Sequence, residues 1–139
     1  MRILVIDDNK IYRKMAKYIL STEGHRVFLA GGLEDGIKMA ESKNPHLILL
    51  DLMMPDTDGF EVCEKLKNDP KTKDIPVFIL SAKEQMRDIE KAFHVGADDY
   101  ITKSVAKKFC LGDLILGKLL NLEDKKKETS SSNIKNKTT

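Results

Sequence analysis

Five short apolar runs divide the chain, at residues 3–6, 27–30, 47–50, 77–80 and 100–101. The first, third and fourth runs are continuously apolar, which is typical of strands that are buried on both faces of a parallel sheet. The second and fifth runs are less uniform and fit the edges of such a sheet. The pattern therefore predicts a five-stranded parallel sheet that is covered on both faces, rather than a sheet with one face exposed to solvent.

The segments between these runs repeat apolar residues at the spacing of one helix face. We expect helices built around residues 12–19, 33–40, 60–66, 89–95 and 105–120. Asp8 or Asn9 can cap the first helix, and Pro45 and Pro70 lie just past the ends of the second and third. Strand and helix thus alternate along the whole chain. This order predicts an α/β domain with a parallel sheet and right-handed crossovers.

The composition is that of one globular domain: 139 residues, 41% hydrophobic and 33% charged. No apolar run approaches the roughly 18 residues that a membrane-spanning helix needs, and no signal-peptide pattern opens the chain. We therefore expect a cytoplasmic protein without membrane insertion.

The net charge of +2 comes from the last segment of the chain, residues 123–139, which holds five Lys against three acidic residues. The preceding 122 residues are balanced in charge, so nothing in them suggests direct nucleic-acid binding. The segment 123–139 is rich in Lys, Ser, Thr and Asn. We expect a domain over residues 1–122, followed by a disordered tail or the start of a linker.

Cysteine and histidine suggest no metal or redox chemistry. Cys63 and Cys110 have no second cysteine or histidine at ligand spacing, so both are expected to be small buried hydrophobes. His25, His46 and His94 do not follow a predicted strand, and we interpret them as ordinary surface or boundary residues.

Polar residues follow four of the five apolar runs. The first run is followed by Asp7 and Asp8, the third by Asp51, the fourth by Ser81, and the fifth by Thr102 and Lys103. In open α/β sheets the ligand crevice lies beyond the carboxyl ends of the strands, so these side chains are expected to converge there.

The chemistry of this set favours phosphoryl transfer. Three adjacent carboxylates repel one another unless a cation intervenes, and hard oxygen ligands with few neutral partners suit Mg²⁺. A lysine beside such a site is a suitable counterion for a phosphoryl group. A carboxylate can itself act as the nucleophile and form an aspartyl phosphate.

Five motifs, in order, resemble the receiver domain of two-component response regulators, of the stand-alone chemotaxis-regulator type. They are Asp7-Asp8; Asp51 with Met53-Met54-Pro55 and Gly59; Ser81-Ala82; Gly96-Ala97-x-Asp99-Tyr100; and Lys103. The resemblance covers residues 1 to about 122. It implies a doubly wound, flavodoxin-like (βα)5 fold with a parallel sheet of order 2-1-3-4-5.

The resemblance also implies a role for each motif residue. Asp51 is the expected phosphoacceptor and Lys103 its counterion. Asp8, Asp51 and the backbone carbonyl of Met53 are the expected Mg²⁺ ligands, with Asp7 acting through a water. Ser81 and Tyr100 are the expected switch pair.

The implied partners are a sensor histidine kinase or phosphotransfer protein and a downstream protein target. The implied activity is that of a phosphoacceptor with at most slow self-dephosphorylation. In this family, the positions of Met53 and Lys83 shape the access of water to the phosphoryl group.

Three rival sites fit the residues less well. A calcium-binding EF-hand with Gly59 at its sixth position would have Met54 and Lys65 where its end ligands belong. Haloacid-dehalogenase-type phosphatases need a second aspartate two residues after the nucleophile, where Met53 stands. A flavodoxin-type nucleotide binder would have a Ser/Thr/Gly-rich loop after the first strand instead of two aspartates.

The sequence departs from the family at two places. Lys103 is followed by Ser104, where the family usually has a proline after a cis bond; we expect a trans bond here, because a cis bond before a non-proline residue costs about 3–4 kcal/mol. The last predicted helix is apolar in nearly every direction. This fits either a partner or homodimer surface, or a long helix with irregular ends or with apolar residues covered by the tail. Two further interpretations stay open: a degenerate receiver that binds partners without phosphorylation, and a Mg²⁺-dependent aspartyl-phosphate phosphatase.

Overall fold

The computed structural model describes residues 1–55, 57–108 and 110–137, with side chains through Lys127. Its elements are β1 (Arg2–Ile6), α1 (Lys10–Thr22), β2 (Arg26–Ala30), α2 (Leu33–Lys43), β3 (Leu47–Leu50), β4 (Met53–Met54), β5 (Thr57–Asp58), α3 (Gly59–Asn68), β6 (Val77–Ser81), α4 (Met86–His94), β7 (Asp99–Thr102), α5 (Lys103–Lys108) and α6 (Leu111–Lys137).

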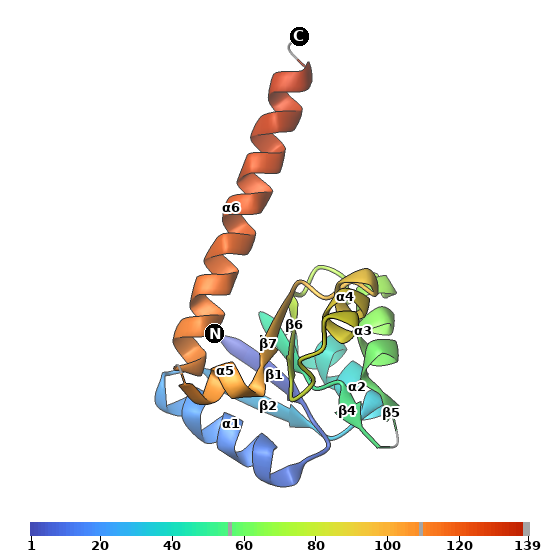
Figure 1. Cartoon of the computed structure of the whole chain (residues 1–139), viewed down its shortest axis with the longest axis vertical. Helices are drawn as coiled ribbons and strands as arrows, with labels where there is room; N and C mark the ends of the chain where they lie inside the picture. The colour runs from blue at the N-terminus through green and yellow to red at the C-terminus, as the bar shows by residue number, and fades with distance from the viewer. Residues whose placement is uncertain (56, 109, 138–139) are drawn as a thin grey trace.

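The centre is a five-stranded parallel sheet of order β2-β1-β3-β6-β7 (Figure 1). Strands β4 and β5 form a separate two-residue antiparallel hairpin after β3. Without this hairpin the order is 2-1-3-4-5, so the predicted sheet, its topology and its five strands are confirmed.

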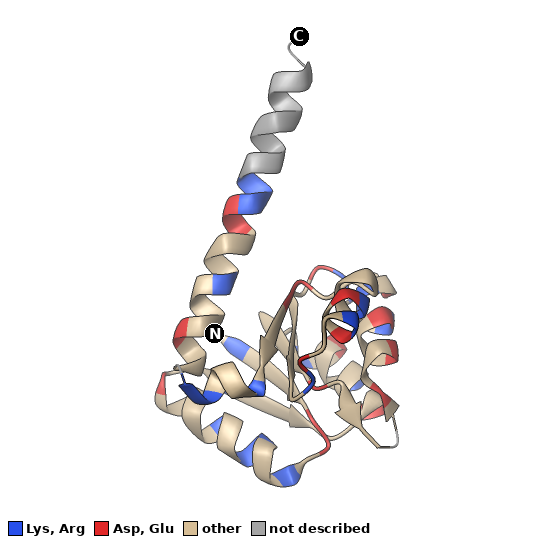
Figure 2. Cartoon of the chain, viewed as in Figure 1, with Lys and Arg blue, Asp and Glu red and all other residues tan. Residues whose placement is uncertain are grey.

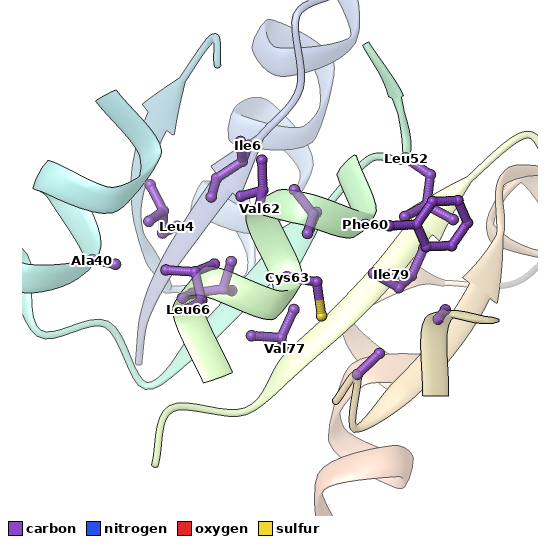
Figure 3. Packing of buried hydrophobic residues seen from close by; sticks show 14 of the residues in the cluster. Leu4, Ile6, Ala40, Leu52, Phe60, Val62, Cys63, Leu66, Val77 and Ile79 are labelled. Carbon is purple, nitrogen blue, oxygen red and sulfur yellow. The ribbon is translucent and has the colours of Figure 1, made fainter. Parts of the chain in front are cut away.

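Each face of the sheet has its own core. Leu4, Ile6, Ile48 and Ile79 belong to the cluster that includes residues of α2, α3 and α4. In Figure 3 the side chains of α3 lie over the β1 and β6 residues of this cluster. The alternate residues of the same strands join α1, α5 and α6 in a second cluster on the opposite face: Ile3, Val5, Leu47, Leu49, Phe78 and Leu80. The apolar runs are continuous because both faces of each strand are covered.

The helix starts follow local capping. The Asn9 side chain accepts a hydrogen bond from the Tyr12 amide at 3.0 Å, which decides between Asp8 and Asn9 as the cap of α1. Asp58 caps α3 by accepting from the Phe60 amide at 2.9 Å. Helix α3 therefore begins immediately after the hairpin that follows Asp51.

The last predicted helix is wrong as a single element. Helix α5 ends at Lys108 and a separate helix, α6, begins at Leu111; the Cys110 carbonyl accepts from the Leu114 amide at 3.0 Å in the first turn of α6. The Cys110 thiol contacts Glu23 at the end of α1, with Sγ and Oε1 2.9 Å apart. Cys110 is exposed, contrary to the prediction, whereas Cys63 is buried as predicted.

Helix α6 buries one side and exposes another. Leu111 and Ile115 lie in the core, while Leu116 is 55% and Leu120 52% exposed. The helix extends away from the sheet in Figure 1 and its backbone continues to Lys137. The expected boundary at residue 122 and the disordered tail beyond it remain predictions.

Among the residues that the structure describes, no helix combines the length and the apolar character needed to cross a membrane.

Candidate functional site

Strand register brings Asp7 and Asp51 together. Ile6 of β1 pairs with Leu50 of β3, so the residues that follow the two strands leave the same edge of the sheet side by side. The Asp51 amide still donates to the Ile6 carbonyl at 2.9 Å, which continues the ladder by one step. The two aspartates are thus placed by backbone pairing.

Asp7, Asp8 and Asp51 form one cluster, in which a carboxylate oxygen from each lies within 4.8 Å of the others. Asp7 is 2% and Asp51 5% exposed, while Asp8 is more accessible to solvent. Backbone amides orient the two buried carboxylates. Asp7 Oδ1 accepts from the Asn9 amide at 2.9 Å, and Asp51 Oδ1 accepts from the Met53 amide at 3.0 Å.

The remaining oxygens of the two buried carboxylates share one ammonium. Lys103 Nζ donates to Asp7 Oδ2 at 3.1 Å and to Asp51 Oδ2 at 3.2 Å. Burial alone would lower the pKa of Lys103, but the charges of Asp51 and Asp7 outweigh it and raise that pKa. Burial raises the pKa of Asp7, and the neighbouring Asp51 charge adds to the rise, despite the opposing Asn9 amide and Lys103.

The donor set fits a hard divalent cation. Three carboxylates face a single lysine, so the cluster keeps an excess of negative charge on oxygens that lie within 4.8 Å of one another. Oxygen-only donors with one open, more exposed side match the preference of Mg²⁺, which retains several of its waters. This acidic triad is typical of the Mg²⁺ site in receiver domains. The Met53 carbonyl remains a predicted fourth contributor.

Ser81 and Tyr100 meet at the backbone of Lys83. Ser81 is fully buried, and its Oγ accepts from the Lys83 amide at 3.3 Å. The Tyr100 hydroxyl donates to the Lys83 carbonyl at 2.8 Å, and the residue is only 9% exposed. Burial raises the pKa of Tyr100, against the opposing effect of the Ser81 hydroxyl. The predicted switch residues, at the end of β6 and in β7, are thus both hydrogen-bonded to the backbone of one loop, which links β6 to α4.

An open pocket lies along the segment that follows Asp51. It has a volume of about 610 Å³, and its lining includes Met53, Pro55 and Lys83. Met53 is half exposed and comes two residues after Asp51. The two side chains predicted to control water access therefore border the same pocket.

The peptide bond after Lys103 differs from the family pattern as expected. No cis peptide bond occurs in the described part of the chain, so the Lys103–Ser104 bond is trans, and Lys103 still reaches both carboxylates. The Ser104 hydroxyl donates to Glu84 of the β6–α4 loop and lies 3.2 Å from the Thr102 hydroxyl. Ser104 therefore connects the start of α5, where Lys103 lies, to the loop that follows Ser81.

The structure brings together the predicted set Asp7, Asp8, Asp51 and Lys103. Met53 is bonded to Asp51, and Ser81 and Tyr100 are both bonded to the backbone of Lys83. Sequence reasoning missed Tyr12, which it assigned only to the apolar face of the first helix. The Tyr12 ring centroid lies 3.8 Å from Lys103 Nζ. An aromatic residue one helical turn after Asp8 was the available signal, since it faces the same end of the sheet.

A model of the response regulator receiver domain matches residues 3–111. The chain is 36% identical over 112 residues to Protein PilG of Pseudomonas aeruginosa, covering 81% of this chain and 83% of that protein. It is 38% identical over 103 residues to the transcriptional regulatory protein AfsQ1 of Streptomyces coelicolor, covering 74% of this chain and 44% of that protein. The chain thus spans less than half the length of AfsQ1, and likewise of RpaA of Synechocystis, at 42%.

Solved structures show the same fold. A receiver domain protein (CheY-like) from Methanospirillum hungatei superposes with a TM-score of 0.74 at 28% identity, covering 91% of this chain and 97% of that one. The chemotaxis protein CheY4 of Vibrio cholerae, at 24% identity and a TM-score of 0.70, covers 73% of this chain and 85% of its own, and supports the fold alone. The family model, the relatives and the acidic cluster agree: the chain belongs to the response regulator receiver domains of two-component signalling.

Proposed function

We propose that this chain is a phosphorylation-dependent receiver that accepts a phosphoryl group on Asp51 from a sensor histidine kinase or phosphotransfer protein. The observation that carries the proposal is the Lys103 ammonium, which bridges Asp7 and Asp51 at the carboxyl edge of the sheet. A merely structural aspartate would not need two further carboxylates and a lysine within reach of it.

The transfer is a substitution at phosphorus. An Asp51 carboxylate oxygen forms the new bond, the bond from phosphorus to the donor imidazole nitrogen breaks, and the electron pair leaves with that nitrogen. The Met53 amide holds one Asp51 oxygen, which orients the nucleophile. Lys103 then redirects a hydrogen bond to the phosphoryl oxygens. Asp8, Asp51, the Met53 carbonyl and, through water, Asp7 would hold Mg²⁺, which offsets the charge on the transferring group.

The output would be a rearrangement around Ser81 and Tyr100. Movement of the Ser81 hydroxyl toward the phosphoryl group breaks its bond to the Lys83 amide and frees the loop to which Tyr100 is also bonded. The Tyr100 ring can then fill the vacated space. Water would remove the phosphoryl group slowly, through the side of the pocket bordered by Met53 and Lys83.

A protein partner is supported by the surface beside the site. Helix α1 carries Lys and Arg but no acidic residue, as Figure 2 shows. Ile11 and Tyr18 on this helix are each 73% exposed. The combination suits an acidic protein surface with apolar side chains. The downstream partner, like the cytoplasmic location, follows from the family alone.

Self-association through α6 is a second element of the proposal, supported by the exposed Leu116 and Leu120. Residues 1–122 would form the receiver and residues 123–139 a tail or the start of a linker. Sedimentation velocity at high concentration, with and without a phosphoryl mimic, tests the self-association. A monomer in both states would reject it.

The phosphoacceptor role is tested by intact mass after incubation with Mg²⁺ and acetyl phosphate, beside Asp51→Asn. We expect a gain of one phosphoryl group that is lost in the variant and on chelation of Mg²⁺. An unmodified wild-type protein that still binds Mg²⁺ would instead favour a degenerate receiver, an interpretation kept open by Ser104 in place of proline. Turnover of an exogenous phosphate ester would favour the phosphatase.

A further inference from the structure

The ammonium of Lys103 lies against the ring of Tyr12. The distance from Nζ to the ring centroid is 3.8 Å, well inside the roughly 6 Å limit for a cation–π contact. The other cation–aromatic contacts in the described residues lie between 4.4 and 5.8 Å and involve surface cations rather than the site lysine. The Tyr12 contact is therefore the closest of its kind and the one that reaches the acidic cluster.

The ring and the carboxylates hold the same nitrogen. Lys103 has three N–H donors, of which Asp7 and Asp51 accept one each. The Tyr12 ring covers a further part of the ammonium, and the lysine side chain is only 18% exposed as a result of all these contacts. Water therefore has little access to a group whose position matters for the chemistry.

A series of contacts that begins and ends at Asp7 positions the Tyr12 ring. The Asp7 carboxylate accepts from the Asn9 amide at 2.9 Å, and the Asn9 side chain accepts from the Tyr12 amide at 3.0 Å. The Tyr12 ring contacts Lys103, which returns to the other oxygen of Asp7 at 3.1 Å. The first turn of α1 therefore places the ring relative to the same carboxylate to which the lysine binds.

We propose that Tyr12 is a positioning residue for Lys103, holding its ammonium beside Asp51 before and during phosphoryl transfer. This inference rests on the proposed function. During transfer, Lys103 must redirect the hydrogen bond that it gives to Asp51 toward a phosphoryl oxygen. Lysine has a flexible four-carbon stem, and its position is costly to fix by one contact. With Asp7 and Tyr12 retained, the ammonium pivots in place and does not return to solvent.

The test compares rates of phosphorylation by acetyl phosphate at saturating Mg²⁺ in the full chain. Tyr12→Leu removes the ring face and is expected to lower the rate about three- to tenfold, the range of a partly desolvated cation–π contact. Tyr12→Phe keeps the face and should restore the rate to within about twofold of wild type. Phe93→Leu, at a 46% exposed aromatic residue of α4, is the control and should leave the rate unchanged.

A direct readout of the contact accompanies the kinetics. The ε-methylene protons of Lys103 should show an upfield ring-current shift by NMR in the wild type and Tyr12→Phe, and lose it in Tyr12→Leu. If the role of Tyr12 were purely structural, the ring-current shift and the phosphorylation rate would not change together across the variants. If Tyr12→Leu fails to fold, Tyr12→Met, which keeps a good helix former at the position, takes its place.

The outcomes separate the two proposals. A wild-type protein that is not phosphorylated rejects the proposed function, and this inference with it. A phosphorylated wild type with an unchanged rate in Tyr12→Leu rejects only the role of Tyr12. An absent ring-current shift in the wild type rejects it as well.

Discussion

Replacing Gly59 by alanine should destabilise the fold at the point where it supports Asp51. Gly59 is the first residue of α3 and lies against the chain that leaves β3. A Cβ placed on it would come within 2.5 Å of Leu52 Cα and 2.7 Å of the Asp51 carbonyl oxygen. Both are backbone atoms, so no side chain can rotate away, and either α3 or the Asp51–Leu52 segment must move.

The magnitude follows from the kind of contact. Inserting a methyl group into a packed core typically costs 1–3 kcal/mol, and a backbone clash belongs at or above the upper end, at about 3 kcal/mol. For a domain of this size that corresponds to a fall of roughly 6–12 °C in Tm. Because the Met53 amide holds Asp51 Oδ1, the same shift should also slow phosphorylation.

Urea unfolding monitored by circular dichroism measures the change in free energy. Gly117→Ala is the matched control, because Gly117 lies inside α6 and a methyl group added to it would have no described atom within 4 Å apart from its chain neighbours and the backbone of its own helix. It should stabilise the helix by about 0.5–1 kcal/mol. If Gly59→Ala unfolds at the wild-type midpoint, α3 does not approach the Asp51 backbone this closely, and the clash inferred at Gly59 does not exist.

Three further outcomes are expected. Asp98→Asn should lower the free energy of unfolding by about 1–3 kcal/mol, because Asp98 Oδ2 accepts from the Val77 amide and from Lys67 Nζ, each at 2.9 Å. An unchanged urea midpoint would contradict this expectation. A thiol reagent at pH 8 should label one cysteine in the native protein, the exposed Cys110. Cys63 is buried, and burial raises its pKa to about 12, which favours the unreactive protonated thiol. Rapid labelling of both cysteines would refute the burial of Cys63. Mg²⁺ at 100 times its Kd should raise the free energy of unfolding by about 2.7 kcal/mol, and no shift in Tm on adding Mg²⁺ would argue against the site.

The interior of the fold could be predicted because it depends on local, repeating patterns. Two-sided burial requires continuous apolar strands, and strand-end residues of a parallel sheet share one edge whatever connects them. The positions of Asp7, Asp51 and Ser81 follow from those two facts alone. Lys103 follows the last strand and obeys the same rule.

The resemblance to receiver domains supplied information that the hydrophobic pattern does not contain. The strand order and the roles of individual residues came from the five motifs and not from periodicity, because local spacing does not say which strands are neighbours. The family comparison confirms the fold and the class of protein, while the roles of individual residues await the experiments above.

Contacts between distant residues were decided by the tertiary structure alone. The approach of Tyr12 to Lys103 joins the first helix to the end of the last strand, and the contact between Glu23 and Cys110 joins the end of α1 to the start of α6. The second contact joins residues that are 87 positions apart in the chain. Neither partner carries a local signal of the other, since the geometry of such pairs exists only after the sheet and its helices have packed. The sequence by itself therefore determined the strands and the acidic edge of the sheet, and packing determined how that edge is held.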